Sequence, residues 1–221
     1  MPFKHSVLLT FGLLTSSFLF AQQKVSGFFE PEAKVIWYGI DYTHAKYIGG
    51  MFSGAMPGLM EPGEFKNLVV PFLNGLVIKE HGKYNLEKTF SKAYIKIDTS
   101  LIAYINRGMD VKNFQTYDNI EHHIEKSKIQ ESLQNYPIPL VENTFGIIVF
   151  TETINKIENH TSYYVTVFDN SNKKELFSFY IDAPFHGGSV KPHSSFTILN
   201  MLEQIRKSEY RNLEKKYSDK K

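Results

Sequence analysis

The side chains best suited to chemistry follow the most apolar stretch near the start of the chain. Residues 35–40 read Val-Ile-Trp-Tyr-Gly-Ile, and Asp41, His44 and Lys46 come soon after them. A histidine beside a carboxylate can act as a base with its orienting partner, and the end of a buried strand often holds a ligand. We therefore interpret Asp41, His44 and Lys46 as a candidate ligand-binding site. In the simpler interpretation, Asp41 caps the strand end and the other two side chains lie on a solvated segment.

A second candidate is the loop before the last apolar helix, which reads His186-Gly-Gly-Ser189. The backbone amides that open a helix can receive an anion there. A Ser189 nucleophile would need a sharp strand-to-helix turn and an acidic partner, and the spacing shows neither. His186 is therefore a candidate ligand-binding residue, and no residue is assigned a catalytic role.

A third group combines His122 and His123 with Glu121 and Glu125. On a helix, adjacent side chains point about 100° apart, so His122 shares a face with Glu125 but not with His123. The paired-histidine spacing of a zinc-binding helix is absent. We interpret the group as a solvated helix face, and the sequence predicts neither a metal ion nor a cofactor.

Glycine and proline interrupt the chain between residues 49 and 63, where several apolar side chains also occur. No Gly-Lys-Ser/Thr motif follows, which argues against a phosphate-binding loop. An apolar loop of this kind either packs onto its own domain or contacts a partner. The candidate partner-contact residues are Met51, Phe52, Met56 and Met60.

The elements that position these residues follow from the period of the apolar side chains. Residues 35–42 are apolar on both alternating faces, which predicts a strand covered on both sides or central in its sheet. Residues 64–81 repeat at the helical period and predict an amphipathic helix kinked at Pro71. Asp118-Asn119 is expected to cap a second helix over 120–136.

The remaining segments decide the fold class. One or two strands are expected over residues 94–97 and 101–105. Residues 145–157, 162–168 and 175–181 predict an antiparallel meander because turn-rich segments separate them. A helix after Ser194 or Ser195 closes the domain. This order predicts an α+β fold, with one mostly antiparallel sheet, a meander in its C-terminal half, and helices packed largely on one face.

The first residues have the layout of a secretory signal peptide: Met1-Pro-Phe-Lys-His, an apolar run to Phe20, then Ala21. The run is shorter than the roughly 20 residues that cross a bilayer, so no transmembrane segment is expected in the mature chain. We predict a signal peptide over 1–21, a single α+β domain over 22–207 and a charged helical tail over 208–221.

Composition narrows the function classes. The 221 residues include no cysteine, which excludes disulfides, thiolate metal ligands and thiol nucleophiles. The 25 Lys and Arg residues nearly balance the 23 Asp and Glu residues and are spread among them, whereas nucleic-acid binding needs a concentrated basic face. We therefore expect no nucleic-acid partner.

Two segments carry a resemblance to a family. Residues 37–46, Trp-Tyr-Gly-Ile-Asp-Tyr-Thr-His-Ala-Lys, and residues 163–170, Tyr-Tyr-Val-Thr-Val-Phe-Asp-Asn, resemble segments of small exported proteins of Bacteroidetes. The element order is also similar to that of periplasmic assembly domains such as the amino-terminal domain of TolB, an analogy of fold alone. The resemblance implies export to the periplasm or cell surface and no assigned activity.

Together these features predict an exported periplasmic or envelope-associated binding or assembly module without catalytic activity, with an envelope protein as its partner. The alternative is a metal-assisted or His/Asp-based hydrolase that uses Asp41 and His44, with Glu152 or Asp182 brought near by the sheet. A stoichiometric bound metal ion would favour the alternative.

Overall fold

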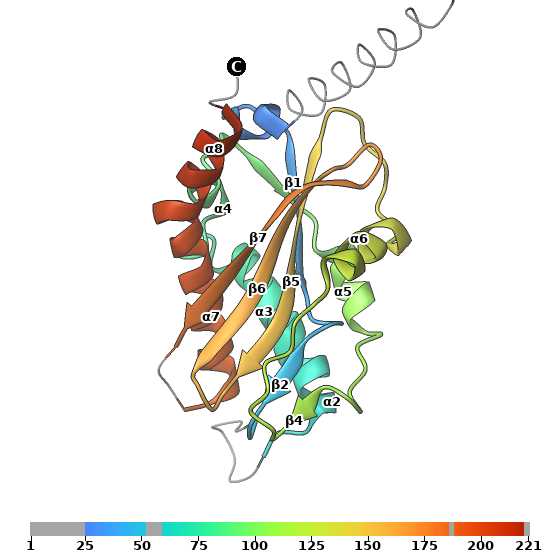
Figure 1. Cartoon of the computed structure of the whole chain (residues 1–221), viewed down its shortest axis with the longest axis vertical. Helices are drawn as coiled ribbons and strands as arrows, with labels where there is room; N and C mark the ends of the chain where they lie inside the picture. The colour runs from blue at the N-terminus through green and yellow to red at the C-terminus, as the bar shows by residue number, and fades with distance from the viewer. Residues whose placement is uncertain (1–24, 52–58, 186–187, 219–221) are drawn as a thin grey trace, which may run out of the picture.

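The computed structural model of the chain describes residues 25–51, 59–185 and 188–218. The predicted signal peptide, Phe52, Met56 and His186 lie outside these residues. Within them, one seven-stranded sheet crosses the molecule (Figure 1). Its strands are β1 (Val35–Asp41), β2 (Lys46–Ile48), β3 (Ile95–Ile97), β4 (Gln115–Thr116), β5 (Phe145–Asn155), β6 (His160–Asp169) and β7 (Lys174–Pro184).

The sheet is built around β5. Along one edge β5 pairs antiparallel with β6, which in turn pairs antiparallel with β7. Along the other edge β5 pairs parallel with β1 over residues 145–150 and with β2 over residues 153–155. β1 and β2 therefore follow each other along the same edge of β5. β3 and β4 extend the sheet outward from them, again in parallel.

The prediction of a mostly antiparallel sheet is wrong. β3, β1, β5, β2 and β4 pair with one another only in parallel, so this is a parallel α/β-type sheet to which β6 and β7 are added. The predicted meander of β5, β6 and β7 is present. Its strands are consecutive and joined by short turns, so a local sequence pattern is enough to predict it. Parallel partners are distant in the chain and need a crossover between them, so local patterns do not reveal their pairing.

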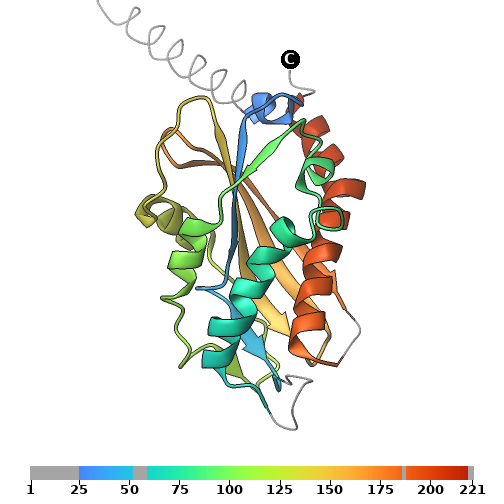
Figure 2. The same cartoon turned by 180° about the vertical axis from the view of Figure 1, so that it is seen from behind.

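Helices cover both faces of the sheet, so the prediction of helices on one face is also wrong (Figures 1 and 2). α3, α4, α7 and α8 contribute to the core on one face, and α5 and α6 to the core on the other. The helical segments are α2 (Pro62–Glu64), the π-helical turn Phe65–Val69, α3 (Val70–Lys79), α4 (Leu86–Thr89), α5 (Ser100–Asn106), α6 (Lys126–Asn135), α7 (Val190–Gln204), the π-helical turn Ile205–Glu209 and α8 (Tyr210–Ser218).

Burial of β1 on both faces is confirmed. Trp37 and Ile40 are each 1% exposed and belong to the core beneath α3 and α7, whereas Ile36 and Tyr38 belong to the core beneath α5 and α6. The side chains of one strand thus serve two cores, as the sequence of residues 35–42 predicts. Strict alternation would place Ile40 with Ile36 and Tyr38, but the register shift between Trp37 and Gly39 places it in the core of Trp37.

Two buried asparagines complete the outer edge of β1 where β3 ends. The backbone N–H of Ile40 donates to Asn74 Oδ1 at 2.8 Å, and the N–H of Tyr42 donates to Asn106 Oδ1 at 2.8 Å. The Ile40 carbonyl accepts from both side-chain amides, at 3.0 and 2.9 Å. Gly39, with a φ of +120°, allows this approach, since a Cβ there would lie 2.6 Å from Asn74 Oδ1. These hydrogen bonds fix the position of the backbone at the end of β1, from which the polar residues follow.

One side of the last helix, α8, packs against the body of the domain. In α8, Tyr210 is buried, and the half-buried Tyr217 stacks on Phe177 with ring centres 5.4 Å apart. Phe29, in the helical residues 25–29, contacts both tyrosine rings.

No helix among the described residues is both long and apolar enough to span a bilayer.

Candidate functional site

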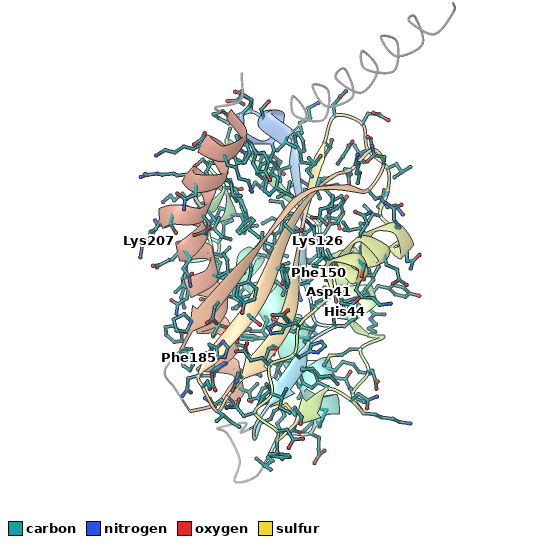
Figure 3. All side chains as sticks on the ribbon, in the orientation of Figure 1. Asp41, His44, Lys126, Phe150, Phe185 and Lys207 are labelled. Carbon is teal, nitrogen blue, oxygen red and sulfur yellow. The ribbon has the colours of Figure 1, made fainter. Side chains whose placement is uncertain are left out.

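Asp41 lies at the carboxyl end of β1 with both carboxylate oxygens engaged (Figure 3). Oδ1 accepts the backbone N–H and the hydroxyl of Thr43, each at 2.7 Å, and Oδ2 accepts the hydroxyl of Tyr136. Burial, and then the charge of Asp41, raises the pKa of Tyr136, so Tyr136 stays a donor. These contacts attach the end of α6 to the end of β1, which is the capping role of the simpler interpretation.

His44 and Lys46 point to other partners. His44 Nε2 lies 2.8 Å from the hydroxyl of Ser132 on α6, and its ring packs near Phe150 with ring centres 6.2 Å apart. Lys46 Nζ donates to the backbone carbonyl of Asn113. Asp41 and His44 thus both join α6 to the end of β1, through Tyr136 and Ser132, whereas Lys46 joins the segment around Asn113 to β2.

The predicted partner-contact residues divide between described and undescribed positions. Met51 and Met60 are buried, and the Met60 N–H donates to the Met51 carbonyl at 2.5 Å, which joins the two ends of the loop. Neither methionine is therefore free for a partner. Phe52 and Met56 lie outside the described residues.

Exposed apolar side chains do occur at this end of the molecule, at positions that the sequence did not single out. They come from three segments and are 50% to 73% exposed. We call this set the apolar rim; its members are Leu59, Tyr117, Ile120 and Ile157.

Backbone contacts hold the segments of the apolar rim together. The Gly49 N–H donates to the Thr116 carbonyl at 2.8 Å, which brings Tyr117 beside the end of β2. A Cβ at Gly49 would lie 3.3 Å from Ile157 Cγ1. β2, β4 and β5 all finish here, and the crevice beyond the carboxyl ends of parallel strands is where α/β sheets bind ligands.

A polar cluster lies next to the apolar rim. Its centre is His160, the first residue of β6, which is only 8% exposed. His160 Nδ1 is 2.6 Å from Asp182 Oδ1, and its Nε2 is 3.5 Å from Glu121 Oε1 and 3.9 Å from Glu158 Oε2. Nε2 has no hydrogen-bond partner among the described residues. Three carboxylates from three segments therefore surround one buried imidazole.

Glu152 supports the cluster from within the sheet. It is buried, its Oε1 accepts the Ile124 N–H at 2.7 Å, and its Oε2 accepts the Ser162 hydroxyl at 3.1 Å. His123 Nδ1 lies 3.5 Å from the same Oε1. Asp182, a companion of Asp41 in the hydrolase alternative, thus contacts His160 instead, and Glu152, the other companion, contacts Ile124, Ser162 and His123.

The helix predicted over 120–136 is shorter than expected, and this explains why the cluster was missed. α6 begins only at Lys126. Before it, the Ile124 N–H is bound by Glu152 and the His122 carbonyl accepts from the Thr153 hydroxyl at 2.9 Å, so β5 side chains take backbone groups that a helix would use. Glu121 is therefore on an irregular segment that lies against the sheet, and not on a solvated helix face.

His193 is a buried residue of α7. Its ring packs edge-on against Phe185 with centres 4.8 Å apart, and burial lowers its pKa to about 3. It is therefore neutral at physiological pH and part of the packing.

Comparison of the chain with known protein families, curated proteins and solved structures finds no match.

Proposed function

We propose that this protein is an exported, envelope-associated binding module that holds a partner protein at the end of the sheet where β2, β4 and β5 finish. The observation that carries the proposal is the apolar rim. Four exposed apolar side chains on three segments lie at one end of the fold, and apolar patches on protein surfaces mark interaction sites. Tyrosine and isoleucine beside a polar cluster are also a composition suited to an interface with an apolar centre and a polar margin.

Export remains an expectation from the residues before Gln22. The signal-peptide layout and the absence of cysteine are compatible with a periplasmic or surface location, where the partner would be another envelope protein. A hydrolase that uses Asp41 and His44 has less support, because Asp41 accepts from Thr43 and Tyr136 while His44 contacts Ser132.

The proposal is tested by placing charge in the apolar rim. The double variant Leu59→Asp/Tyr117→Asp should lose co-purification with an envelope protein that the unaltered protein retains, because a buried unpaired carboxylate at an interface is costly. Its melting temperature should change by no more than a few degrees, since both side chains are at least half exposed.

The matched control is Tyr94→Asp/Tyr104→Asp, which changes two equally exposed side chains outside the apolar rim. The control should keep the partner. If both double variants retain the partner, or both lose it, the apolar rim is not the contact surface.

A further inference from the structure

The structure brings together three side chains with metal-ligand atoms that are far apart in the sequence. Glu121 precedes α6, Glu158 lies in the turn between β5 and β6, and His160 opens β6. One ligand atom from each lies within 4.8 Å of the other two. Exposed carboxylates often gather without an ion, so a further observation is needed to distinguish a metal site from a solvated cluster.

That observation is the buried and unpartnered Nε2 of His160. Asp182 Oδ1 lies 2.6 Å from Nδ1, and Nε2 is buried without a hydrogen-bond partner among the described residues. Nε2 faces Glu121 Oε1 and Glu158 Oε2, at 3.5 and 3.9 Å. An imidazole nitrogen and two carboxylate oxygens are ligand atoms that a metal cation between them would hold together, and the cation would also offset the repulsion between the two carboxylates.

We propose that Glu121, Glu158 and His160 bind one divalent transition-metal ion, of which Zn²⁺ is the representative. One imidazole nitrogen with two carboxylate oxygens suits this class, whereas Ca²⁺ and Mg²⁺ prefer oxygen ligands alone. Three protein ligands leave a coordination position for water or for a group of a partner. This inference goes beyond the binding function proposed above and does not depend on it.

The surrounding contacts are those of a built metal site. A carboxylate on the second nitrogen of a ligating histidine fixes the ring and its tautomer, and Asp182 has this position. The Asn119 amide donates to Glu158 Oε1 at 2.8 Å and leaves Oε2 for the ion. Asn119 is itself held by Asn155 at 2.9 Å. Asp182 thus orients His160 and Asn119 orients Glu158, while His123 Nε2 lies 3.9 Å from Glu121 Oε2; both glutamates are exposed.

The bound ion would fasten the segment before α6 to the β5–β6 turn, because its ligands come from both. Ligand binding to the folded state alone raises the melting temperature, so the metal should stabilise the protein measurably.

Titration calorimetry of the chelator-treated protein with ZnCl₂ tests the site. We expect one equivalent to bind, with an accompanying rise in melting temperature, and no such rise with millimolar CaCl₂ or MgCl₂. His160→Asn should weaken Zn²⁺ binding by about 100-fold or more, and Asp182→Asn by about 10- to 100-fold, the range found for groups that orient a ligating histidine.

Glu121→Gln keeps the test valid if the His160 substitution unfolds the protein, because Glu121 is exposed and its loss should leave the fold intact. The control is His81→Asn, which removes an exposed histidine 3.0 Å from Glu87 and should leave Zn²⁺ affinity unchanged. The proposal is overturned if the unaltered protein binds no stoichiometric Zn²⁺, or if Glu121→Gln and His160→Asn bind it as tightly as the control.

Discussion

Lys92 shows at the scale of one residue how the structure joins the two ends of its described chain. It is only 6% exposed, its Nζ donates to the Tyr210 hydroxyl at 2.8 Å, and it lies 4.8 Å from the centre of the Phe28 ring. Burial lowers its pKa to about 8, although the charges of Glu214 and Glu30 act in the opposite direction. The ammonium group is thus held mainly by aromatic rings and a hydroxyl.

This contact predicts a pH dependence of stability. The folded-state pKa of Lys92 lies below its unfolded value, so the unfolded chain binds more protons between about pH 8 and pH 10.5, and stability rises with pH in that window. The variant Lys92→Met has no titrating group at this position and therefore lacks this pH-dependent contribution to stability. Relative to that variant, the free energy of unfolding of the unaltered protein should increase by roughly 2 kcal/mol from about pH 8 to pH 10.

Urea unfolding of both proteins at several pH values measures the difference, and comparison of the two removes the titration of the other groups. Parallel pH profiles would show that Lys92 keeps its ordinary pKa in the folded protein.

At the scale of elements, the break between β1 and β2 explains where the polar residues lie. β1 leaves β5 after Asp41 and the pairing resumes at Lys46, so residues 42–45 have no strand partner on β5. Asn74 of α3 and Asn106 of α5 satisfy backbone groups on the other edge of β1. The interruption is therefore supported by α3 and α5.

Asn106→Ala should lower the free energy of unfolding by about 1–3 kcal/mol, because it leaves the buried N–H of Tyr42 without a partner. Asn74→Ala should cost a similar amount through Ile40. The exposed Asn212→Ala in α8 is the control and should change stability by less than about 0.5 kcal/mol. Chemical denaturation measures all three, and equal stabilities would contradict the proposed support of the strand break.

The segment before α6 shows why part of the candidate site was not predicted. Ile120, Ile124, Ile129 and Leu133 recur near the helical period, yet the first of them is exposed and the helix starts after the second. Glu152 binds the Ile124 N–H and so competes with helix formation. That partner is distant in the sequence, and periodicity does not detect it.

For the molecule as a whole, the sequence predicts the strongly apolar strands and the antiparallel meander well, but it does not predict the parallel pairing. The burial of residues 35–42 and the β5–β7 meander follow from local patterns. The parallel partners of β5 do not, since β2, β3 and β4 are two or three residues long and Leu101–Ile105, expected as a strand, lies in α5. A short apolar run fits a strand or a buried helix equally well.

The end of the sheet that we propose as the contact surface could likewise be predicted only in part from the sequence. The sequence pointed to the loop after residue 49, and the structure adds residues from β4, the segment before α6 and the β5–β6 turn to that end of the fold. His160 was passed over because it stands in a turn-like Asn-His-Thr segment, and its carboxylate partners are near it only in the folded chain.

We expect this end of the sheet to contact a partner protein, and site-specific photo-cross-linking in the producing cells tests that contact. A photoreactive phenylalanine analogue in place of Tyr117 should give a discrete adduct with an envelope protein, whereas the same analogue in place of the equally exposed Tyr94 should give none. No adduct at 117, or the same adduct at both positions, would contradict the account.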